Sequence, residues 1–456
     1  MTAAVILAAG AGTRMRSHRA KVLHELGGLP LLEHVLIRVQ NLGLAETVVV
    51  TGYDRERVDA LVGDRARLVH QPAILGTGDA VGRVLDVLAD DIRQVLVLYG
   101  DGPLVPETLL RELLEAGRNT SGAVLVTARM PDPTGYGRIV RDSHGRVSRI
   151  VEERDLTEET RGLREINSGI GLWPRKALAG ILPRLPRHGE EQFLTDAVGE
   201  LLASGIPVDT ILAPDPARVM GINTRTQLAE AEAILRRDIL SRWMENGVTL
   251  IDPATTYIDA SVQIGMDTVI YPMTTLRGRT TVGEGVRIGP MATISDSELA
   301  DGAVVEQAVV TQSRVGAHAS VGPFSHLRPG TYLDRDVHVG TFVELKNARM
   351  GIGSKAGHHC YLGDVTIGSH VNIGAGTVVV NYDGTAKHPT FIGDDAFIGC
   401  NSNLVAPVEI GPGAYVAAGS TVTHNVPADA LGIARARQEN KPDWARNRRA
   451  SHDSRR

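Results

Sequence analysis

Aromatic residues, cysteines and long apolar runs are all scarce in this chain of 456 residues. Aromatics make up 4% of the sequence against 43% hydrophobic residues, as expected where stacked aliphatic side chains supply much of the core. With only Cys360 and Cys400, no disulfide framework can be predicted. The N-terminus leads directly into an apolar strand without a basic region or a long apolar stretch. We therefore expect no signal peptide, no transmembrane helix and a cytoplasmic protein.

The chain also lacks a strong charge of either sign. Its net charge of −5 predicts no general attraction to nucleic acid or to membranes. The exception is the tail from residue 435 to 456, where eight basic and three acidic residues sum to +5. We interpret it as a solvated, flexible tail and not as a nucleic-acid site, because Trp444 is its only aromatic residue.

What the sequence has in abundance is a six-residue periodicity. A period of six fits neither a helix nor an alternating strand, and it predicts a parallel β-helix in which each rung is one short strand and a turn. One aliphatic residue per rung points inward and stacks on the next coil, and glycine often follows it. The positions in phase are Ile258, Ile264, Ile270, Leu276, Val282, Ile288, Ile294, Val315, Val321, Leu327, Leu333, Val339, Ile367, Ile373, Val379, Ile392, Ile398, Leu404, Ile410, Val416 and Val422.

The periodicity is interrupted twice near its middle. The first interruption lies between Val339 and Ile367, and the second lies between Val379 and Ile392 and contains residues 381–389. Loops extruded from a regular solenoid often carry function, so we expect functional residues at both interruptions.

The part before the solenoid alternates apolar strands with helical patterns. Strands are expected at 5–7, 47–52, 95–99 and 123–128, followed by a hairpin around residues 143–145. This alternation predicts a mostly parallel α/β sheet with helices on both faces, in which ligands bind beyond the carboxyl ends of the strands.

A helix is expected between the two parts. Thr224 and Gln227 form a possible capping box, and Gly247 is a candidate C-cap. We read the apolar stripe of this helix as a packing surface. The predicted domains are therefore 1–224, a connecting helix at 225–247, and a hexapeptide-repeat domain with a basic tail at 248–456.

A glycine-rich turn follows the first strand, at residues 8–13. Its small residues allow backbone amides to approach phosphate oxygens, and a helix start would add its dipole. It is not a dinucleotide fingerprint, because Met15 occupies the third glycine position, and no Gly-Lys-Ser/Thr follows as in a P-loop. Taken alone, the turn is compatible with phosphate binding or with ordinary turn chemistry.

Two oxygen-bearing side chains follow buried segments of the same part. Asp101 ends the run from Val95 through Gly100, where a carboxylate can hold a hard cation such as Mg²⁺ or cap a helix before Pro103. Asn223 is either a second oxygen ligand for the same cation or an ordinary turn residue.

The segment from Leu7 to Met15, with Lys21 downstream, resembles the signature of sugar-1-phosphate nucleotidyltransferases. Together with the solenoid, nearly the whole chain resembles the bifunctional bacterial enzymes of UDP-N-acetylglucosamine synthesis, which join an N-acetylglucosamine-1-phosphate uridylyltransferase to a glucosamine-1-phosphate N-acetyltransferase. The further segments that carry this resemblance are 22–24, 327–330, 342–346, 354–358, 361–364, 372–377 and 381–384.

The resemblance implies a Rossmann-like nucleotidyltransferase domain and a left-handed β-helix that forms a homotrimer, with acetyltransferase sites between subunits. It implies UTP, acetyl-CoA, the two sugar phosphates and Mg²⁺ as small-molecule partners, with Asp101 and Asn223 as metal ligands. The residues that match nucleotide- and sugar-binding positions of the uridylyltransferase are Leu7, Ala8, Ala9, Gly10, Arg14, Lys21, Gln71, Gly76, Thr77, Tyr99, Gly137, Glu152, Asn167 and Asn223.

The same resemblance assigns residues in the solenoid. Those matching positions that bind the sugar phosphate are Arg328, Lys346, Tyr361 and Asn372. Those matching positions along the acetyl-CoA path are Ala375, Asn381, Tyr382, Cys400, Ala418 and Arg435. Three positions depart from the family pattern: Ala20 replaces the usual proline, Asp79 the usual histidine, and Cys400 the usual serine, whose hydroxyl is the stronger hydrogen-bond partner.

His358 is the candidate catalytic base. Acetylation needs a neutral amine, and histidine accepts a proton near neutral pH with little perturbation. His358 stands three residues before Tyr361 at the first interruption, and a coil of 18 residues would stack Arg328 on Lys346 as two cations for one phosphate. Alternation along an extended segment would turn His359 to the opposite face. The resemblance names the same base.

Two other functions remain open at this point. One is a nucleotidyltransferase whose β-helix is structural or regulatory, and the other is a scaffold whose solenoid only assembles subunits. A scaffold has no reason to gather Arg328, Lys346, His358 and Tyr361 at its interruptions.

Overall fold

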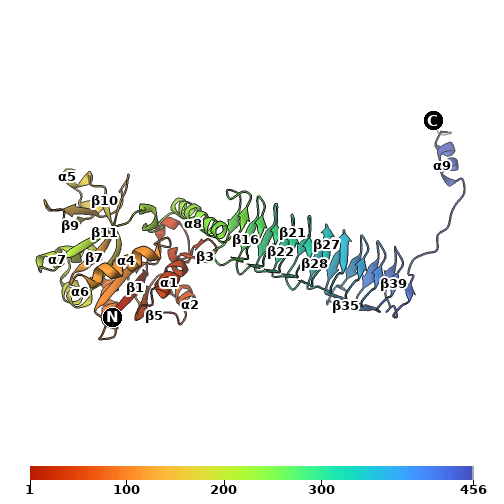
Figure 1. Cartoon of the computed structure of the whole chain (residues 1–456), viewed down its shortest axis with the longest axis horizontal. Helices are drawn as coiled ribbons and strands as arrows, with labels where there is room; N and C mark the ends of the chain where they lie inside the picture. Colours follow the sequence, from red (N-terminus) through yellow and green to blue (C-terminus); the bar gives the residue numbers. More distant parts are fainter. Residues whose placement is uncertain (454–456) are drawn as a thin grey trace. The chain divides into compact units, whose positions relative to one another are not determined.

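The computed structural model describes residues 1–453 and contains two compact units, Met1–Asp238 and the part of the chain from Ile239 onward (Figure 1). The boundary between the units falls inside helix α8 (Arg225–Glu245). Within the described residues, no helix is long and apolar enough to cross a membrane.

The first unit is built on a mostly parallel sheet with the strand order β11-β7-β10-β6-β1-β4-β5. Only β10 runs antiparallel to its two neighbours in this path, and β8 and β9 form a hairpin beside it. The prediction of a mostly parallel sheet is therefore confirmed, although the long antiparallel strand β10 was not foreseen. The strands are β1 (Thr2–Ala8), β4 (Glu46–Thr51), β5 (Arg67–His70), β6 (Gln94–Tyr99), β7 (Ala123–Arg129), β8 (Arg138–Arg141), β9 (Val147–Val151), β10 (Glu165–Pro174) and β11 (Val208–Leu212), with a small pair β2 (Glu25–Leu26) and β3 (Leu29–Pro30).

Helices cover both faces of this sheet. Along β1, Ala3 and Val5 face one core, and Ala4 and Ile6 face the other, as the alternation of a strand buried on both sides requires. Helices α3, α6 and α7 contribute to the first core, and α1, α2 and α4 to the second. The helices are α1 (Leu31–Asn41), α2 (Arg55–Val62), α3 (Gly76–Leu85), α4 (Glu107–Arg118), α5 (Glu158–Arg161), α6 (Arg175–Ile181) and α7 (Ala197–Ala203).

The connecting helix α8 begins with the expected capping box. The Gln227 side chain accepts from the amides of Asn223 and Thr224 at 2.8 and 3.1 Å, and the Thr224 hydroxyl accepts from the Gln227 amide at 3.1 Å. Gly247 follows the helix with φ +86°, a left-handed conformation that suits a C-cap glycine.

The second unit is a solenoid of parallel strands in three sheets, and this hexapeptide stack is a left-handed β-helix (Figure 1). The sheets are named here E, F and G. Sheet E contains β12 (Thr249–Leu250), β15 (Val269–Ile270), β18 (Arg287–Ile288), β21 (Val304–Val305), β24 (Ser320–Val321), β27 (His338–Thr341), β30 (Lys355–His358), β33 (Asn372–Ile373), β36 (Phe397–Ile398), β39 (Tyr415–Val416) and β41 (Leu431–Gly432).

The other two sheets follow in the same order along each coil. Sheet F contains β13 (Tyr257–Ile258), β16 (Thr275–Arg277), β19 (Thr293–Ser295), β22 (Val309–Thr311), β25 (His326–Leu327), β28 (Glu344–Lys346), β31 (Tyr361–Gly363), β34 (Val378–Val380), β37 (Asn403–Val405) and β40 (Thr421–Val422). Sheet G contains β14 (Gln263–Ile264), β17 (Thr281–Val282), β20 (Glu298–Leu299), β23 (Arg314–Val315), β26 (Tyr332–Leu333), β29 (Arg349–Met350), β32 (Val365–Ile367), β35 (Thr390–Ile392) and β38 (Val408–Ile410).

The predicted break in phase between Val339 and Ile367 is confirmed, although it contains no extruded loop. Inward-facing residues continue through it without a gap, including Leu345, Met350 and Leu362, which are all buried. The sequence phase shifts because some rungs are one residue shorter. Residues paired between adjacent coils accordingly lie 16, 17 or 18 residues apart, as in Glu298–Arg314, Val339–Ala356 and Val321–Val339.

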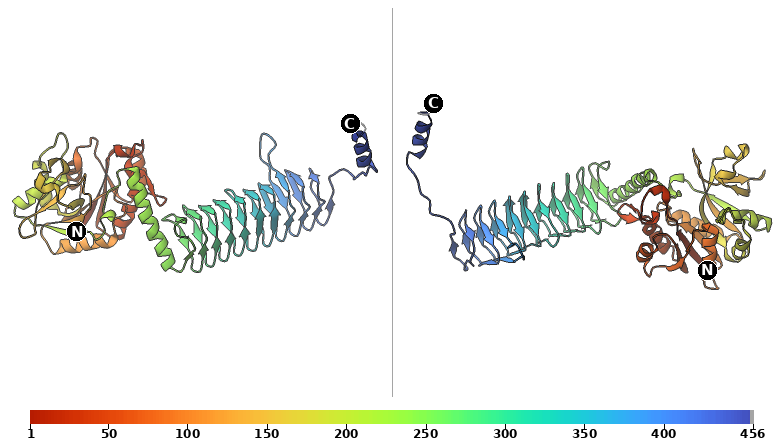
Figure 2. Two further views of the ribbon diagram at one scale, coloured as in Figure 1. Left: turned by 90° about the horizontal axis from the view of Figure 1, so that it is seen from above. Right: turned by 180° about the vertical axis from the view of Figure 1, so that it is seen from behind.

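The second interruption is a true insertion. Residues 381–389 leave the coil after β34 and return at β35, and a loop stands out from the regular coils in this part of the solenoid (Figure 2). The prediction of a loop at this place is confirmed.

The C-terminal tail is exposed from residue 435 to 451, as a solvated segment should be, but it also contains helix α9 (Trp444–Asp453). The basic residues Arg455 and Arg456 of the predicted tail lie outside the described residues.

Candidate functional site

The glycine-rich turn of the first unit brings its backbone close to Lys21. Gly12 has φ +67°, and a Cβ built on it would lie 2.5 Å from the Cβ of Lys21, so a side chain at position 12 would displace the lysine. The turn does not lead into a long helix, whose start would have added its dipole. Only a short 3-10 segment, Thr13–Met15, follows it, so the macrodipole of a long helix does not contribute here.

Lys21 joins the two candidate metal ligands. Its Nζ donates to Asn223 Oδ1 at 2.8 Å, across 202 residues of sequence, and forms an ion pair with Asp101 Oδ2. Asp101 is not a helix cap, because α4 starts at Glu107 and has Pro106 at its N-cap. The carboxylate and the amide oxygen therefore converge on one cation at the carboxyl edge of the sheet.

Two adjoining cavities open at this edge, with volumes of about 340 and 220 Å³. Both are lined by Lys21, Thr77, Tyr99 and Asp101. The larger cavity also contains the predicted residues Gly137, Glu152, Asn167 and Asn223. The smaller also contains the predicted residues Leu7, Ala8, Ala9, Gly10, Gln71 and Gly76. The structure thus brings together every residue expected here except Arg14, which is exposed and lines neither cavity.

Tyr99 lines both cavities as a neutral phenol. Burial raises its pKa well above the ordinary value, and the nearby carboxylates of Asp101 and Glu152 raise it further. Gly169 lies against its ring with φ +83°, and a Cβ there would come within 2.4 Å of the aromatic carbon. The phenol can therefore donate a hydrogen bond but does not serve as a base near neutral pH.

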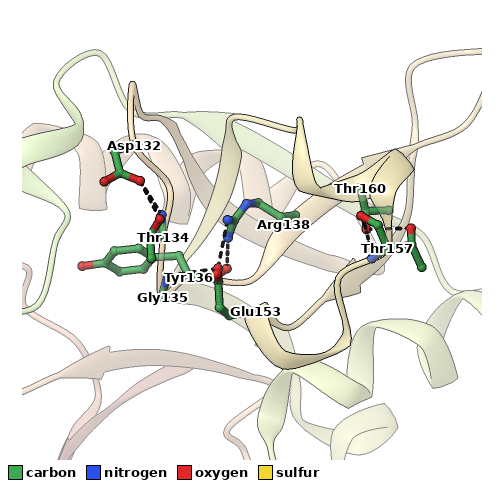
Figure 3. A network of polar contacts seen from close by, with 8 residues as sticks. All are labelled: Asp132, Thr134, Gly135, Tyr136, Arg138, Glu153, Thr157 and Thr160. Carbon is green, nitrogen blue, oxygen red and sulfur yellow. Dashed lines mark hydrogen bonds and ion pairs between the residues drawn. The ribbon is translucent and has the colours of Figure 1, made fainter.

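The segment that carries Gly137 is held in place by a carboxylate from the next loop. Glu153 accepts from the Gly135 amide at 3.0 Å and pairs with the buried Arg138 at 2.9 Å (Figure 3). Glu152, beside it, accepts from the Thr195 hydroxyl at 2.7 Å. These contacts position the wall of the larger cavity.

The departure at Ala20 has a structural counterpart. Its amide donates to Asp54 Oδ2 at 3.1 Å, a contact that proline could not make because it has no N–H. The loop before Lys21 is thereby tied to the start of α2, so the absence of proline does not leave it unconstrained.

In the second unit, cationic side chains of sheet F stack as predicted. The register pairs Leu327 with Leu345, which places Arg328 and Lys346 on adjacent coils, and Arg328 also pairs with Glu344 at 2.8 Å. The ammonium of Lys387 lowers the pKa of Lys346, and Arg328 lowers it further. Three positive charges therefore gather beside one another, an arrangement that suits a dianionic phosphate.

In the next coil, the Tyr361 hydroxyl and the Asn381 amide occupy the space beside Gly363. Gly363 pairs with Lys346 in the register, and a Cβ at that glycine would lie 2.6 Å from the Tyr361 hydroxyl and 2.7 Å from the amide nitrogen of Asn381. Tyr361 therefore reaches over the glycine toward the cationic group.

The candidate base and three acetyl-CoA positions form one column at the corner between sheets E and F. The amides of Gly376, Asn401 and Gly419 donate to the carbonyls of the residues one coil below, at 3.3, 2.7 and 2.8 Å. Those acceptors are His358, Ala375 and Cys400, and the register continues to Ala418. Arg435 lies against the last coil, with its Cδ 3.7 Å from a Cβ built on Gly419.

His359 does not follow the alternation expected of an extended segment. Strand β30 ends at His358, and His359 takes φ +48° at the corner. Its ring packs on Phe342 with centroids 5.0 Å apart, so His359 is a member of an aromatic stack.

The inserted loop contains both predicted residues Asn381 and Tyr382. Asn381 is buried and donates to the carboxylate of Asp364 at 2.5 Å, which ties the loop to the coil below. Tyr382 is exposed, and its hydroxyl donates to the Gly384 carbonyl at 2.6 Å. Asn372, the remaining predicted residue, lies in β33, a strand of sheet E.

Sequence reasoning did not assign three residues that the geometry adds to this group. Lys387 approaches Lys346 from the inserted loop, Glu344 pairs with Arg328, and Asp364 binds the loop. Lys387 could have been suspected from the sequence, because it lies in the insertion that breaks the periodicity. The contacts of Glu344 and Asp364 could not, because they depend on the register of the coils.

The α/β unit with its glycine-rich turn and the hexapeptide solenoid with its cationic side chains on sheet F together define a two-part transferase. Family models agree: residues 4–166 match the MobA-like NTP transferase domain, and residues 389–424 match the bacterial transferase hexapeptide repeats. The chain is 45% identical to "Bifunctional protein GlmU" of Geobacillus sp. (strain WCH70) over 97% of both chains. It is 46% identical to the proteins of that name from Brevibacillus brevis and Heliobacterium modesticaldum, over 97% of this chain and 96% and 97% of theirs. The chain belongs to the family of bifunctional GlmU proteins.

Proposed function

We propose that the chain carries out two successive reactions of UDP-N-acetylglucosamine synthesis, one in each unit. The second unit acetylates glucosamine-1-phosphate with acetyl-CoA. The first unit transfers a uridylyl group from UTP to N-acetylglucosamine-1-phosphate and releases pyrophosphate. The observation that carries this proposal is the column of His358, Ala375, Cys400 and Ala418. A β-helix that is only structural does not need a titratable side chain at the end of such a column.

Uridylyl transfer requires alignment and charge neutralisation more than a base, because the sugar phosphate is already an anionic nucleophile. Lys21 and the amides of residues 10–13 would bind the phosphates of UTP. The uracil would lie in the smaller cavity beside Gln71, and the sugar in the larger cavity beside Glu152 and Asn167.

Asp101 and Asn223 would hold Mg²⁺ together with the phosphates of the bound nucleotide. Both oxygens lie within reach of one ammonium, so they also lie within reach of one metal ion. No group of three His, Cys, Asp or Glu residues suited to a metal occurs among residues 1–453, and Mg²⁺ commonly takes one or two protein ligands and completes its shell with water and phosphate. The ion would neutralise charge on the phosphates.

In the acetyltransferase site, Arg328, Lys346 and Lys387 would bind the sugar phosphate, with Tyr361 and Asn372 beside it. Acetyl-CoA would run along the corner past Arg435, Ala418, Cys400 and Ala375, with further contacts from Asn381 and Tyr382 of the inserted loop. His358, at the foot of this column, would accept a proton from the amine as it attacks the thioester carbonyl.

Trimer formation is part of the proposal, and an apolar stripe at the same corner supports contact between copies. Met273, Met291, Phe324 and Phe342 are 59, 47, 54 and 51% exposed and occupy equivalent corner positions of separate coils. Stripes of this kind commonly mark protein interfaces. Because His359 continues this stripe next to His358, a neighbouring subunit at this corner would lie close to the base.

We assign residues 1–224 to uridylyl transfer, 225–247 to a connecting helix and 248–456 to acetyl transfer. UTP and acetyl-CoA are cytoplasmic metabolites, so the enzyme would act in the cytoplasm on small molecules, and not on nucleic acid or at a membrane.

The test is to incubate the purified protein with glucosamine-1-phosphate, acetyl-CoA, UTP and Mg²⁺ while thiol and pyrophosphate release are followed separately. Thiol release should need only the first two compounds. Pyrophosphate release should need UTP, Mg²⁺ and the acetylated sugar phosphate. Pyrophosphate release without any thiol release would leave the β-helix a structural element and overturn the acetyltransferase assignment.

A further inference from the structure

The side chain of Gln71 has a single orientation that satisfies its surroundings. It is only 2% exposed and lines the smaller cavity. Its Nε2 donates to the Gly76 carbonyl at 3.1 Å and to Asp79 Oδ2 at 2.8 Å. Both partners lie in α3, so the amide nitrogen points into the protein along this helix.

The chemistry of the two acceptors requires the same orientation of the Gln71 amide. A peptide carbonyl and an ionised carboxylate only accept hydrogen bonds, so both must face the NH₂ group of the amide and not its oxygen. The two hydrogens of Nε2 are then used. Oε1 has no hydrogen-bond donor among residues 1–451, whose side chains the structure describes, and it is the polar atom that Gln71 can offer to a ligand in the cavity.

Asp79 is held ionised by Arg83. The guanidinium donates to the carboxylate at 2.7 Å through Nε and at 3.3 Å through Nη2. Burial raises the pKa of Asp79, but the hydrogen bonds from Arg83 and Gln71 outweigh burial and bring the pKa below its usual value. The carboxylate therefore stays an acceptor at neutral pH.

We propose that Asp79 is a positioning residue that fixes the Gln71 amide with its oxygen toward the nucleobase and so selects uracil over cytosine. The inference rests on the proposed uridylyl transfer and adds the residue that enforces its base specificity. Uracil has an N–H at ring position 3 that can donate to Oε1, whereas cytosine has an unprotonated acceptor nitrogen there, which would face the oxygen without a hydrogen bond.

The start of α3 extends this match. The first amides of a helix have no intrahelical acceptor, and Gly76 and Thr77 at the start of α3 line the same cavity. They can donate to the carbonyl oxygen that uracil carries beside N3. Cytosine has an amino group at the corresponding position 4. This amino group is itself a donor, so it could not accept a hydrogen bond from the amides of Gly76 and Thr77.

The family commonly has histidine where this chain has Asp79, and this difference affects how the Gln71 amide can be oriented. A neutral imidazole can donate or accept according to its tautomer, so it does not by itself dictate the orientation of a neighbouring amide. The Asp79–Arg83 pair removes that freedom in this chain.

The experiment measures kcat/KM of uridylyl transfer with UTP and with CTP in the full-length protein. In Asp79→Asn, the new amide can donate to Oε1 of Gln71, so only the Gly76 carbonyl still requires the NH₂ group, and the turned Gln71 amide, with Nε2 toward the base, becomes accessible. The ratio of kcat/KM for UTP over CTP should fall by about 10-fold or more, since each unpaired polar contact contributes to rejection of the wrong base. Arg83→Gln should lower the same ratio by a smaller factor.

Asp86→Asn is the matched control, because Asp86 is exposed just after the same helix and its loss removes the same charge. It should leave the ratio unchanged. If Asp79→Asn does not fold, Arg83→Gln serves instead, because it removes the partner that holds Asp79 ionised and should also lower the ratio. A folded Asp79→Asn protein, or Arg83→Gln in its place, with the wild-type ratio would overturn the inference. A wild-type protein that is inactive with UTP would overturn the proposed function, which is a different outcome.

Discussion

The two units assemble their sites in opposite ways. In the first unit, Lys21 and Asn223 are hydrogen-bonded across 202 residues, and crossover connections bring such distant segments to one edge of a parallel sheet. In the second unit, His358, Ala375, Cys400 and Ala418 come together through the register of successive coils alone. At a sheet edge, segments that are distant in sequence come together, whereas in a solenoid equivalent positions of successive coils stack on one another.

This difference has consequences for how each site tolerates change. The sheet-edge site depends on local details at each contributing segment, such as the close approach of Gly12 to Lys21. The solenoid site depends on register, and a rung one residue shorter is accommodated because the inward residue of the next rung still reaches the core.

Removing the solenoid is the largest test of this comparison. A fragment that ends at Asn246 keeps all of the segments that build the sheet-edge site, so it should retain uridylyl transfer and lose acetyl transfer completely. The measurements are the two activities and the oligomeric state by light scattering. A trimeric fragment would contradict the assignment of subunit assembly to the solenoid.

Asp101→Asn should abolish one activity in the intact protein. Loss of the carboxylate removes the charged candidate ligand of Mg²⁺, and uridylyl transfer should fall by about 10³-fold or more. Acetyl transfer should stay near the wild-type rate. Asp90→Asn, at an exposed carboxylate of the same unit, is the control and should affect neither reaction.

His358→Ala should lower kcat of acetyl transfer by roughly 10²–10⁴-fold, as loss of a general base typically does. Uridylyl transfer and oligomeric state should not change. His359→Ala is the matched control, since it removes a ring from the corner stack without touching the column, and its effect should be much smaller. Full acetyltransferase activity of His358→Ala from pH 6 to 9 would show that another group is the base.

Lys387→Met tests whether the inserted loop completes the cationic group on sheet F. With one of the three charges removed, KM for glucosamine-1-phosphate should rise about 10-fold, which corresponds to about 1.4 kcal/mol of binding, with a smaller change in kcat. The pKa of Lys346 should rise, because the neighbouring ammonium that lowers it is gone. Arg335→Met, at an exposed turn of the solenoid, should leave KM unchanged; an unchanged KM in Lys387→Met as well would place the phosphate elsewhere.

Ala20→Pro should have the smallest effect. The substitution removes the N–H that donates to Asp54, at a cost of about 1 kcal/mol, and it restricts the unfolded chain, a gain of about 0.4–1 kcal/mol. Ala20 already has φ −54° and ψ 141°, which proline can adopt. Thermal unfolding of the first unit should therefore shift by only a few degrees; a large loss of stability would mean that the Asp54 contact contributes more than an ordinary hydrogen bond.

Much of the fold could be predicted because its signals are periodic. The six-residue spacing of aliphatic residues predicted the solenoid, and strand–helix alternation predicted the mostly parallel sheet. The antiparallel strand β10 could not be predicted, since its direction depends on pairing with β6 and β7, which the segment itself does not encode. The cause of the first break in phase could not be predicted for a related reason, because a one-residue deletion and an inserted loop both break a phase.

The sequence alone determined which chemical groups are present and, through recurring motifs, most of the residues that line the two cavities at the sheet edge. Only the tertiary structure decided which of them meet. Lys21 contacts both Asp101 and Asn223, Lys387 returns to Lys346, and Asp79 orients Gln71. These contacts join side chains through space, and their energies depend on distances and directions that sequence spacing does not specify until the chain is folded.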